Sequence, residues 1–144
     1  MIAIGCDHGG YDLKCEIIKY LQKKGLEYTD FGCNGESVDY PIYAKKVGQA
    51  ILDGEGEKGI LICGTGIGMS IAANKVKGIR AAVWENEFST EMTRAHNNAN
   101  VLCMGARVID TEKAIKLTDI FLDTEFMGDK HLTRINMIAD IENK

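Results

Sequence analysis

Strand-like and amphipathic stretches alternate along the whole of this chain. Five short runs have the apolar, β-branched or aromatic character of strands, and turn residues separate most of them from the next amphipathic stretch. In the strongest of these runs the apolar residues are consecutive, which favours strands covered on both faces, as in a parallel sheet. The predicted strands are residues 1–6, 26–31, 59–63, 79–83 and 101–104.

The stretches between these runs carry apolar residues three and four positions apart, as amphipathic helices do. In the first of them Leu13, Ile17 and Leu21 share one face, and Gly25 follows where a helix can end. The predicted helices are residues 11–24, 40–52, about 69–77, 85–97, 111–122 and about 129–141. This alternation predicts one α/β domain over residues 1–144, a three-layer α/β/α (Rossmann-like) fold with a five-stranded parallel sheet and a C-terminal helix.

Composition narrows the range of partners. The net charge is −4 and there is no basic run, which argues against a nucleic-acid partner. No apolar stretch approaches the roughly 20 residues of a membrane span. No two of the five cysteines form a Cys-x-x-Cys pair, so we expect no metal site and free thiols in a reducing cytoplasm. The cysteines are Cys6, Cys15, Cys33, Cys63 and Cys103.

The third predicted strand ends in Cys63 and is followed by a glycine-rich loop before the next helix. The loop consists of Gly64, Thr65, Gly66, Ile67 and Gly68. Its spacing matches neither a P-loop nor a dinucleotide fingerprint. A tight strand-to-helix turn beside a buried thiol is one interpretation. The other is an anion-binding cradle with a thiolate at its mouth, because ligands in parallel sheets bind beyond the carboxyl ends of the strands.

Polar residues border other predicted strands as well. Asp7 and His8 follow the first strand, and Arg107 follows the fifth. Asp7 could simply cap the first helix, or it could form an acid–imidazole pair with His8. His96 and Asn97 precede the fifth strand, where they could end a helix or belong to a site.

The last predicted helix begins with Lys130, His131 and Arg134 on one face. Such donors at a helix N-terminus suit a phosphate group, although a solvated basic patch has the same pattern. Because the helix is C-terminal, it could reach its own crevice or that of a second subunit.

Seven segments spread over nearly the whole chain together resemble the ribose-5-phosphate isomerase B family, also known as the RpiB/LacA/LacB sugar-phosphate isomerases. The segments are residues 5–10, 39–41, 62–68, 72–75, 78–81, 96–100 and 105–107. The resemblance implies reversible conversion of ribose 5-phosphate to ribulose 5-phosphate in the non-oxidative pentose phosphate pathway. It implies proton transfer through an enediolate, with no metal or organic cofactor. It also implies a homodimer or a dimer of dimers with shared active sites.

The resemblance also assigns roles to individual residues. Cys63 is similar to the base that removes the proton from C2, and His96 to the acid that opens the sugar ring. The other implied catalytic residues are Thr65, beside the enediolate, and Asp7, beside the sugar hydroxyls. The implied substrate-binding residues are His8, Gly64, Gly66, Ile67, Gly68, Asn97, Arg107, Lys130, His131 and Arg134.

One residue departs from the family pattern: position 130 is lysine where many relatives are expected to have arginine. Lysine keeps the charge but loses the two-pronged guanidinium. Two alternative functions remain open at this point. One is isomerisation of a six-carbon sugar phosphate, such as allose or galactose 6-phosphate. The other is phosphate binding without catalysis.

Overall fold

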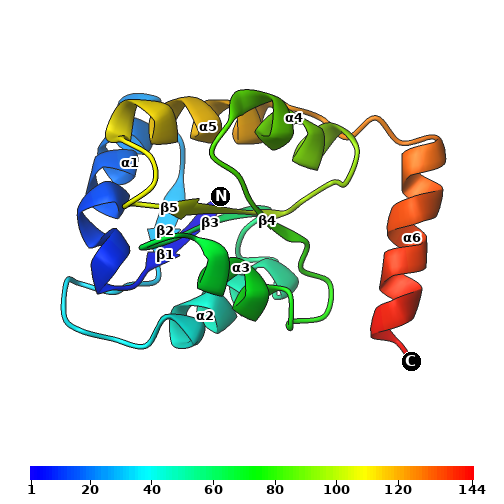
Figure 1. The fold of residues 1–144 in the computed structure, drawn as a ribbon, viewed down its shortest axis with the longest axis horizontal. Helices are drawn as coiled ribbons and strands as arrows, with labels where there is room; N and C mark the ends of the chain where they lie inside the picture. The colour runs from blue at the N-terminus through cyan, green and yellow to red at the C-terminus, as the bar shows by residue number, and fades with distance from the viewer.

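The computed structural model describes all residues from 1 to 144 and contains one sheet of five parallel strands (Figure 1). The order across the sheet is β2-β1-β3-β5-β4. The strands are β1 (Ile2–Cys6), β2 (Tyr28–Asp30), β3 (Lys58–Cys63), β4 (Ala81–Val83) and β5 (Val101–Gly105). The predicted five-stranded parallel sheet is therefore confirmed.

Helices cover both faces of the sheet, which confirms the three-layer prediction. In Figure 1, α4 and α5 lie above the sheet and α2 and α3 below it, with α1 beside α5. The helices are α1 (Tyr11–Lys23), α2 (Tyr40–Leu52), α3 (Ile67–Ala73), α4 (Glu87–Ala95), α5 (Thr111–Asp123) and α6 (Lys130–Glu142). None of them combines the length and apolar character that a membrane-spanning helix requires.

The core is divided into two layers by the sheet. On one side Ile4, Ile60 and Leu102 pack against α1 and α5, with Phe121 fully buried. On the other side Leu61 and its neighbours pack against α2 and α3. Because β1 and β5 are buried throughout and β3 is buried from Gly59 onward, their consecutive apolar residues predict these strands clearly.

Some predicted boundaries are wrong at the edges of the sheet. The strands β2 and β4 are each shorter than the predicted residues 26–31 and 79–83, since an edge strand is paired on one side only. The helix expected to continue to about residue 77 ends at Ala73. The side chain of Asn74 instead bonds both backbone groups of Ala81, at 2.8 and 2.9 Å, and so ties the end of α3 to the start of β4.

The C-terminal helix α6 lies beyond the β4 edge, apart from the three layers (Figure 1). Ile135 is its only buried residue. Its far end is fixed by the backbone N–H of Gly78, which donates a 2.9 Å hydrogen bond to the Glu142 carboxylate. The apolar side chains of Met137, Ile138 and Ile141 remain exposed on this helix.

Candidate active site

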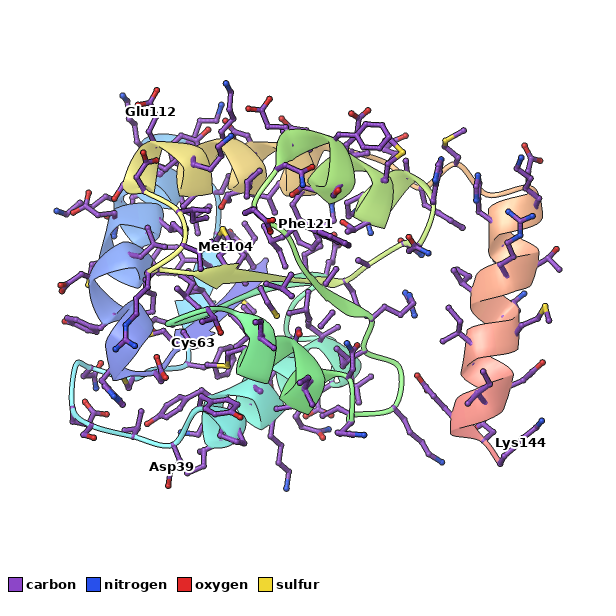
Figure 2. The ribbon with its side chains drawn as sticks, in the orientation of Figure 1. Asp39, Cys63, Met104, Glu112, Phe121 and Lys144 are labelled. Carbon is purple, nitrogen blue, oxygen red and sulfur yellow. The ribbon has the colours of Figure 1, made fainter.

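A pocket of about 490 Å³ opens at the carboxyl end of the sheet, where Cys63 ends β3. Figure 2 shows Cys63 near the middle of the domain, well away from α6. We call this the cysteine pocket. Its lining residues are Asp7, Tyr40, Cys63, Gly64, Thr65, Ile67, Gly68, Ile71 and Arg107. Asp7 after β1, Cys63 at the end of β3 and Arg107 after β5 therefore share one pocket.

The glycine loop holds the sulfur of Cys63 with a backbone donor. The N–H of Gly66 lies 3.1 Å from Sγ of Cys63. Gly66 has a φ of 81°, and a Cβ at this position would come within 2.7 Å of the Val83 side chain and 2.9 Å of the Met104 carbonyl carbon. Only glycine fits here. The Gly66 N–H is therefore a backbone donor aimed at this sulfur.

Further donors in the loop have no acceptor within the chain. The N–H groups of Gly64 and Thr65 make no hydrogen bond, and that of Gly68 belongs to the unpaired first turn of α3. The Thr65 hydroxyl oxygen accepts from the N–H of Ile67 at 3.3 Å, which leaves its own proton free to donate. The loop can therefore offer several donors to an oxyanion beside the sulfur.

Asp7 and His8 are both oriented by backbone groups. One carboxylate oxygen of Asp7 accepts from the Gly10 N–H at 3.1 Å, so the predicted capping role is confirmed, for a short 3-10 turn ahead of α1. The other oxygen has no partner in the chain and remains available to a ligand. The N–H of Val38 donates to Nδ1 of His8 at 3.2 Å, so the neutral ring carries its proton on Nε2.

Arg107 supplies the only cation in the cysteine pocket. Its backbone N–H donates to the Gly64 carbonyl at 3.0 Å, and its side chain extends over Gly64. It takes part in none of the four ion pairs of the chain. A guanidinium without a carboxylate partner at a pocket wall is suited to binding phosphate.

Two residues of the cysteine pocket, Tyr40 and Ile71, were not assigned to the site from sequence. Tyr40 opens α2 and lies against Gly68 across the pocket. The segment 39–41 was part of the family resemblance, so the signal was present, but nothing in the spacing connected it to the glycine loop.

The remaining predicted residues form a second group, the histidine cluster, which consists of His96, Asn97, Lys130, His131 and Arg134. His96 caps the C-terminus of α4, and its ring stacks on that of His131 with centroids 4.1 Å apart and planes 10° from parallel. Partial burial and the nearby His96, Lys130 and Arg134 lower the pKa of His131 below its usual value. Asn97 borders a hollow between α6 and the β4 edge.

The histidine cluster and the cysteine pocket lie at opposite ends of the sheet. Four residues after His96, the carbonyl of Asn100 accepts a hydrogen bond from the N–H of Gly59, at the amino end of β3. Cys63 is four residues further along the same strand, a rise of roughly 13 Å. Because α4 returns from the carboxyl end of β4 to the amino end of β5, one chain does not bring His96 to Cys63.

Other parts of the surface do not add to this site. A hollow of about 500 Å³ between α1 and the β5–α5 connection contains none of the predicted residues. The structure contains no group of three or more His, Cys, Asp or Glu side chains that could hold a metal ion.

The structure is that of a parallel α/β protein with a thiol, backbone N–H donors and an arginine around one pocket. Comparison with known proteins identifies its family. The Ribose/Galactose Isomerase family model matches residues 2–138, so the chain belongs to that family. Ribose-5-phosphate isomerase B of Escherichia coli is 46% identical over 144 residues, which are 99% of this chain and 97% of that protein.

Solved structures agree with this assignment. Ribose-5-phosphate isomerase B of Clostridium thermocellum has a TM-score of 0.97 and 52% identity, with 99% of this chain and 97% of that one covered. The Mycoplasma genitalium protein of the same name, solved with bound ribulose 5-phosphate, has a TM-score of 0.94 and 40% identity, with 99% and 96% covered.

Proposed function

We propose that this chain is a ribose-5-phosphate isomerase that moves a proton between C2 and C1 of the open-chain sugar. The observation that carries the proposal is the Gly66 N–H on Sγ of Cys63, in a pocket with unpaired donors. The family and its relatives named for this reaction support the same conclusion. The proposed chemistry uses only side chains and backbone groups of the protein.

In the proposed reaction the Cys63 thiolate removes the proton from C2 of ribose 5-phosphate. The electron pair of the C–H bond moves to C1–C2, and negative charge develops on the carbonyl oxygen. The free N–H groups of Gly64, Thr65 and Gly68, together with the Thr65 hydroxyl, stabilise this enediolate. A proton passes from the C2 hydroxyl to the C1 oxygen, and Cys63 then returns the first proton to C1, so that C2–O becomes the carbonyl of the ketose. One group can act as base and acid because the same proton is exchanged.

The rest of the sugar is assigned to Asp7 and Arg107, which line the pocket, and to His8, which follows Asp7 in the chain. The free oxygen of Asp7 accepts a sugar hydroxyl, and Nε2–H of His8 donates to one. Arg107 binds the phosphate from the wall of the cysteine pocket. Ring opening requires an acid near the ring oxygen, and the cysteine pocket itself contains no histidine.

We infer that a second copy of the chain supplies the histidine cluster to the cysteine pocket. His96 would then open the ring, Asn97 would bind a hydroxyl, and Lys130, His131 and Arg134 would complete the phosphate site. The separation of the two groups along β3 supports this arrangement, since one chain cannot close the gap. Exposed apolar residues on α3 and α6, among them Ile71 and Ile141, offer surface for such a contact. The proposed assembly is a homodimer or a dimer of such dimers.

A cytoplasmic location fits the thiol content of the chain. All five cysteines are free, and the proposed reaction needs Cys63 reduced. We therefore propose that the protein functions in the reducing cytoplasm, in the non-oxidative pentose phosphate pathway.

The test is an isomerase assay of the purified protein on ribose 5-phosphate beside allose and galactose 6-phosphates. We expect turnover of the pentose to dominate. Cys63→Ala should abolish turnover while ribose 5-phosphate still binds in calorimetry, because the phosphate and hydroxyl contacts remain. Cys15→Ala removes a thiol from α1, outside the pocket, and is the matched control. Preference for a hexose phosphate, or turnover by Cys63→Ala, would contradict the proposal.

A further inference from the structure

Arg94 of α4 connects two segments that together carry the whole histidine cluster. Its side chain is buried, with 8% exposed. On the first segment, Nη1 donates to the Asn98 side chain at 2.8 Å and to the Ala99 carbonyl at 2.7 Å. On the second, Nε donates to the Thr124 carbonyl at 3.1 Å.

The first segment is the turn from α4 into β5, which begins with His96 and Asn97. Asn98 has a φ of 47°, a left-handed conformation that ends the helix, and its carbonyl accepts from Nε of Arg80 at 3.0 Å. His96 and Asn97 therefore precede a backbone position whose unusual conformation is held by arginine side chains.

The second segment runs from Thr124 to Asp129 and leads directly into α6, with its Lys130, His131 and Arg134. Beyond the Arg94 contact, it is joined to α4 by the Met127 N–H, which donates to the Ala95 carbonyl at 3.0 Å. The stacking of His131 on His96 depends on the placement of both segments.

The chemistry of the contact requires arginine in particular. All three acceptors of Arg94 are neutral oxygens, and none of the ion pairs of the chain includes it. A buried cation without a carboxylate is costly unless its donors are well used. A planar guanidinium can donate along several fixed directions at once, whereas a lysine ammonium cannot span the same acceptors.

We propose that Arg94 is a positioning residue: it fixes the turn that carries His96 and Asn97 relative to the segment that carries α6, and so holds the histidine cluster in one arrangement. The expected effect of Arg94 on catalysis rests on the proposed function, in which the cluster completes the active site. Its effect on the geometry of the cluster is independent of that function.

The test compares Arg94→Lys with Lys58→Met as a matched control. Lys58 is half-buried, lies at 5.9 Å over the same Phe121 ring as Arg94, and its ammonium donates to the carbonyls of Phe121 and Leu122 at the end of α5 rather than to the His96 turn. Two measurements are made on each full-length protein. One is the NMR chemical shift of the His96 and His131 ring carbons and protons, which reports their stacking. The other is kcat/KM on ribose 5-phosphate.

In Arg94→Lys we expect both imidazole resonances to move and kcat/KM to fall by about tenfold to 100-fold, the scale of a misplaced catalytic group. Lys58→Met should leave the resonances unchanged and kcat/KM within about twofold of wild type. Unchanged resonances in Arg94→Lys, or the same shifts in Lys58→Met, would overturn the proposal. If Arg94→Lys does not fold, Asn98→Gly removes one of the two acceptors of Nη1, the Asn98 side chain, at a φ that glycine tolerates, and shifts of the same resonances are expected.

The two proposals fail in different ways. If the wild-type protein has no isomerase activity but Arg94→Lys shifts the resonances, the proposed function is wrong and the role of Arg94 in the geometry stands. If the resonances move while turnover is unchanged, the role of Arg94 in the geometry stands, and the histidine cluster does not act in catalysis, which contradicts that part of the proposed function.

Discussion

The ring of Tyr40 lies so close to Gly68 that a Cβ on Gly68 would come within 2.5 Å of the tyrosine Cζ. Gly68→Ala must therefore displace the ring, which forms one wall of the cysteine pocket. We expect kcat/KM on ribose 5-phosphate to fall by about tenfold or more, as for other small displacements in a site. Steady-state kinetics of the purified variant measures this.

A double mutant separates this contact from other effects of the extra methyl group. Tyr40→Ala removes the ring, so adding Gly68→Ala to it should cost little further activity if the ring is the obstacle. Losses that simply add would contradict the steric explanation.

Mixing two inactive variants tests whether sites are shared between chains. Cys63→Ala damages the cysteine pocket and His96→Asn damages the histidine cluster, so a mixed dimer keeps one site with both parts intact. After unfolding and refolding at equal amounts, half of the dimers are mixed, and about a quarter of wild-type activity should return. Recovery is measured against each variant refolded alone. No recovery, in a sample shown to contain mixed dimers, would place each site within one chain.

Two substitutions in the predicted phosphate site should change the KM for ribose 5-phosphate in opposite directions. Arg134→Ala removes a cation and should raise KM for ribose 5-phosphate more than it lowers kcat, because phosphate contacts act on bound substrate and transition state alike. Lys130→Arg restores a guanidinium where many relatives are expected to have one, and should lower KM at an unchanged kcat. An unchanged KM in both variants would remove these residues from the phosphate site.

His131 should make stability depend on pH. Its pKa in the folded protein is lowered from the usual 6.5 by partial burial, His96, Lys130 and Arg134, in that order, while Asp129 opposes them. The folded state therefore binds fewer protons than the unfolded state, so the stability contribution is present above about pH 6.5 and is lost as the pH falls. His131→Asn should lose less thermal stability than wild type between about pH 7.5 and pH 5.5. Identical losses would contradict this, since all carboxylates are common to both proteins.

Much of the fold could be predicted because its central strands are buried on both faces. The strands β1, β3 and β5 are continuous apolar runs, and Gly25, with a φ of 70°, follows the end of α1 as expected. The edge strands were less certain because their limits depend on one neighbour. The end of α3 at Ala73 depends on the Asn74 side chain reaching Ala81, a tertiary contact that helical spacing does not reveal.

The placement of the site could be predicted from the sequence only in part. Asp7, Cys63 and Arg107 lie at the carboxyl ends of strands and share the cysteine pocket. His96 precedes β5, and because the strands are parallel it lies at the opposite end of the sheet from these three residues. Tyr40 was missed because it meets the glycine loop only when α2 and α3 pack together. The roles of these residues in the reaction remain predictions.

The sparse attachment of α6 has a consequence for how the protein is ordered. This helix buries one residue, is fixed at its far end through Glu142, and stacks one ring on His96, so it can unfold locally at a small fraction of the free energy that opens the sheet. A neighbouring copy that covers its exposed apolar face would order the helix and bring its cations to the substrate in the same step. The free energy of association between copies would then also stabilise the complete active site. The turnover rate per chain would therefore rise with the concentration of the protein.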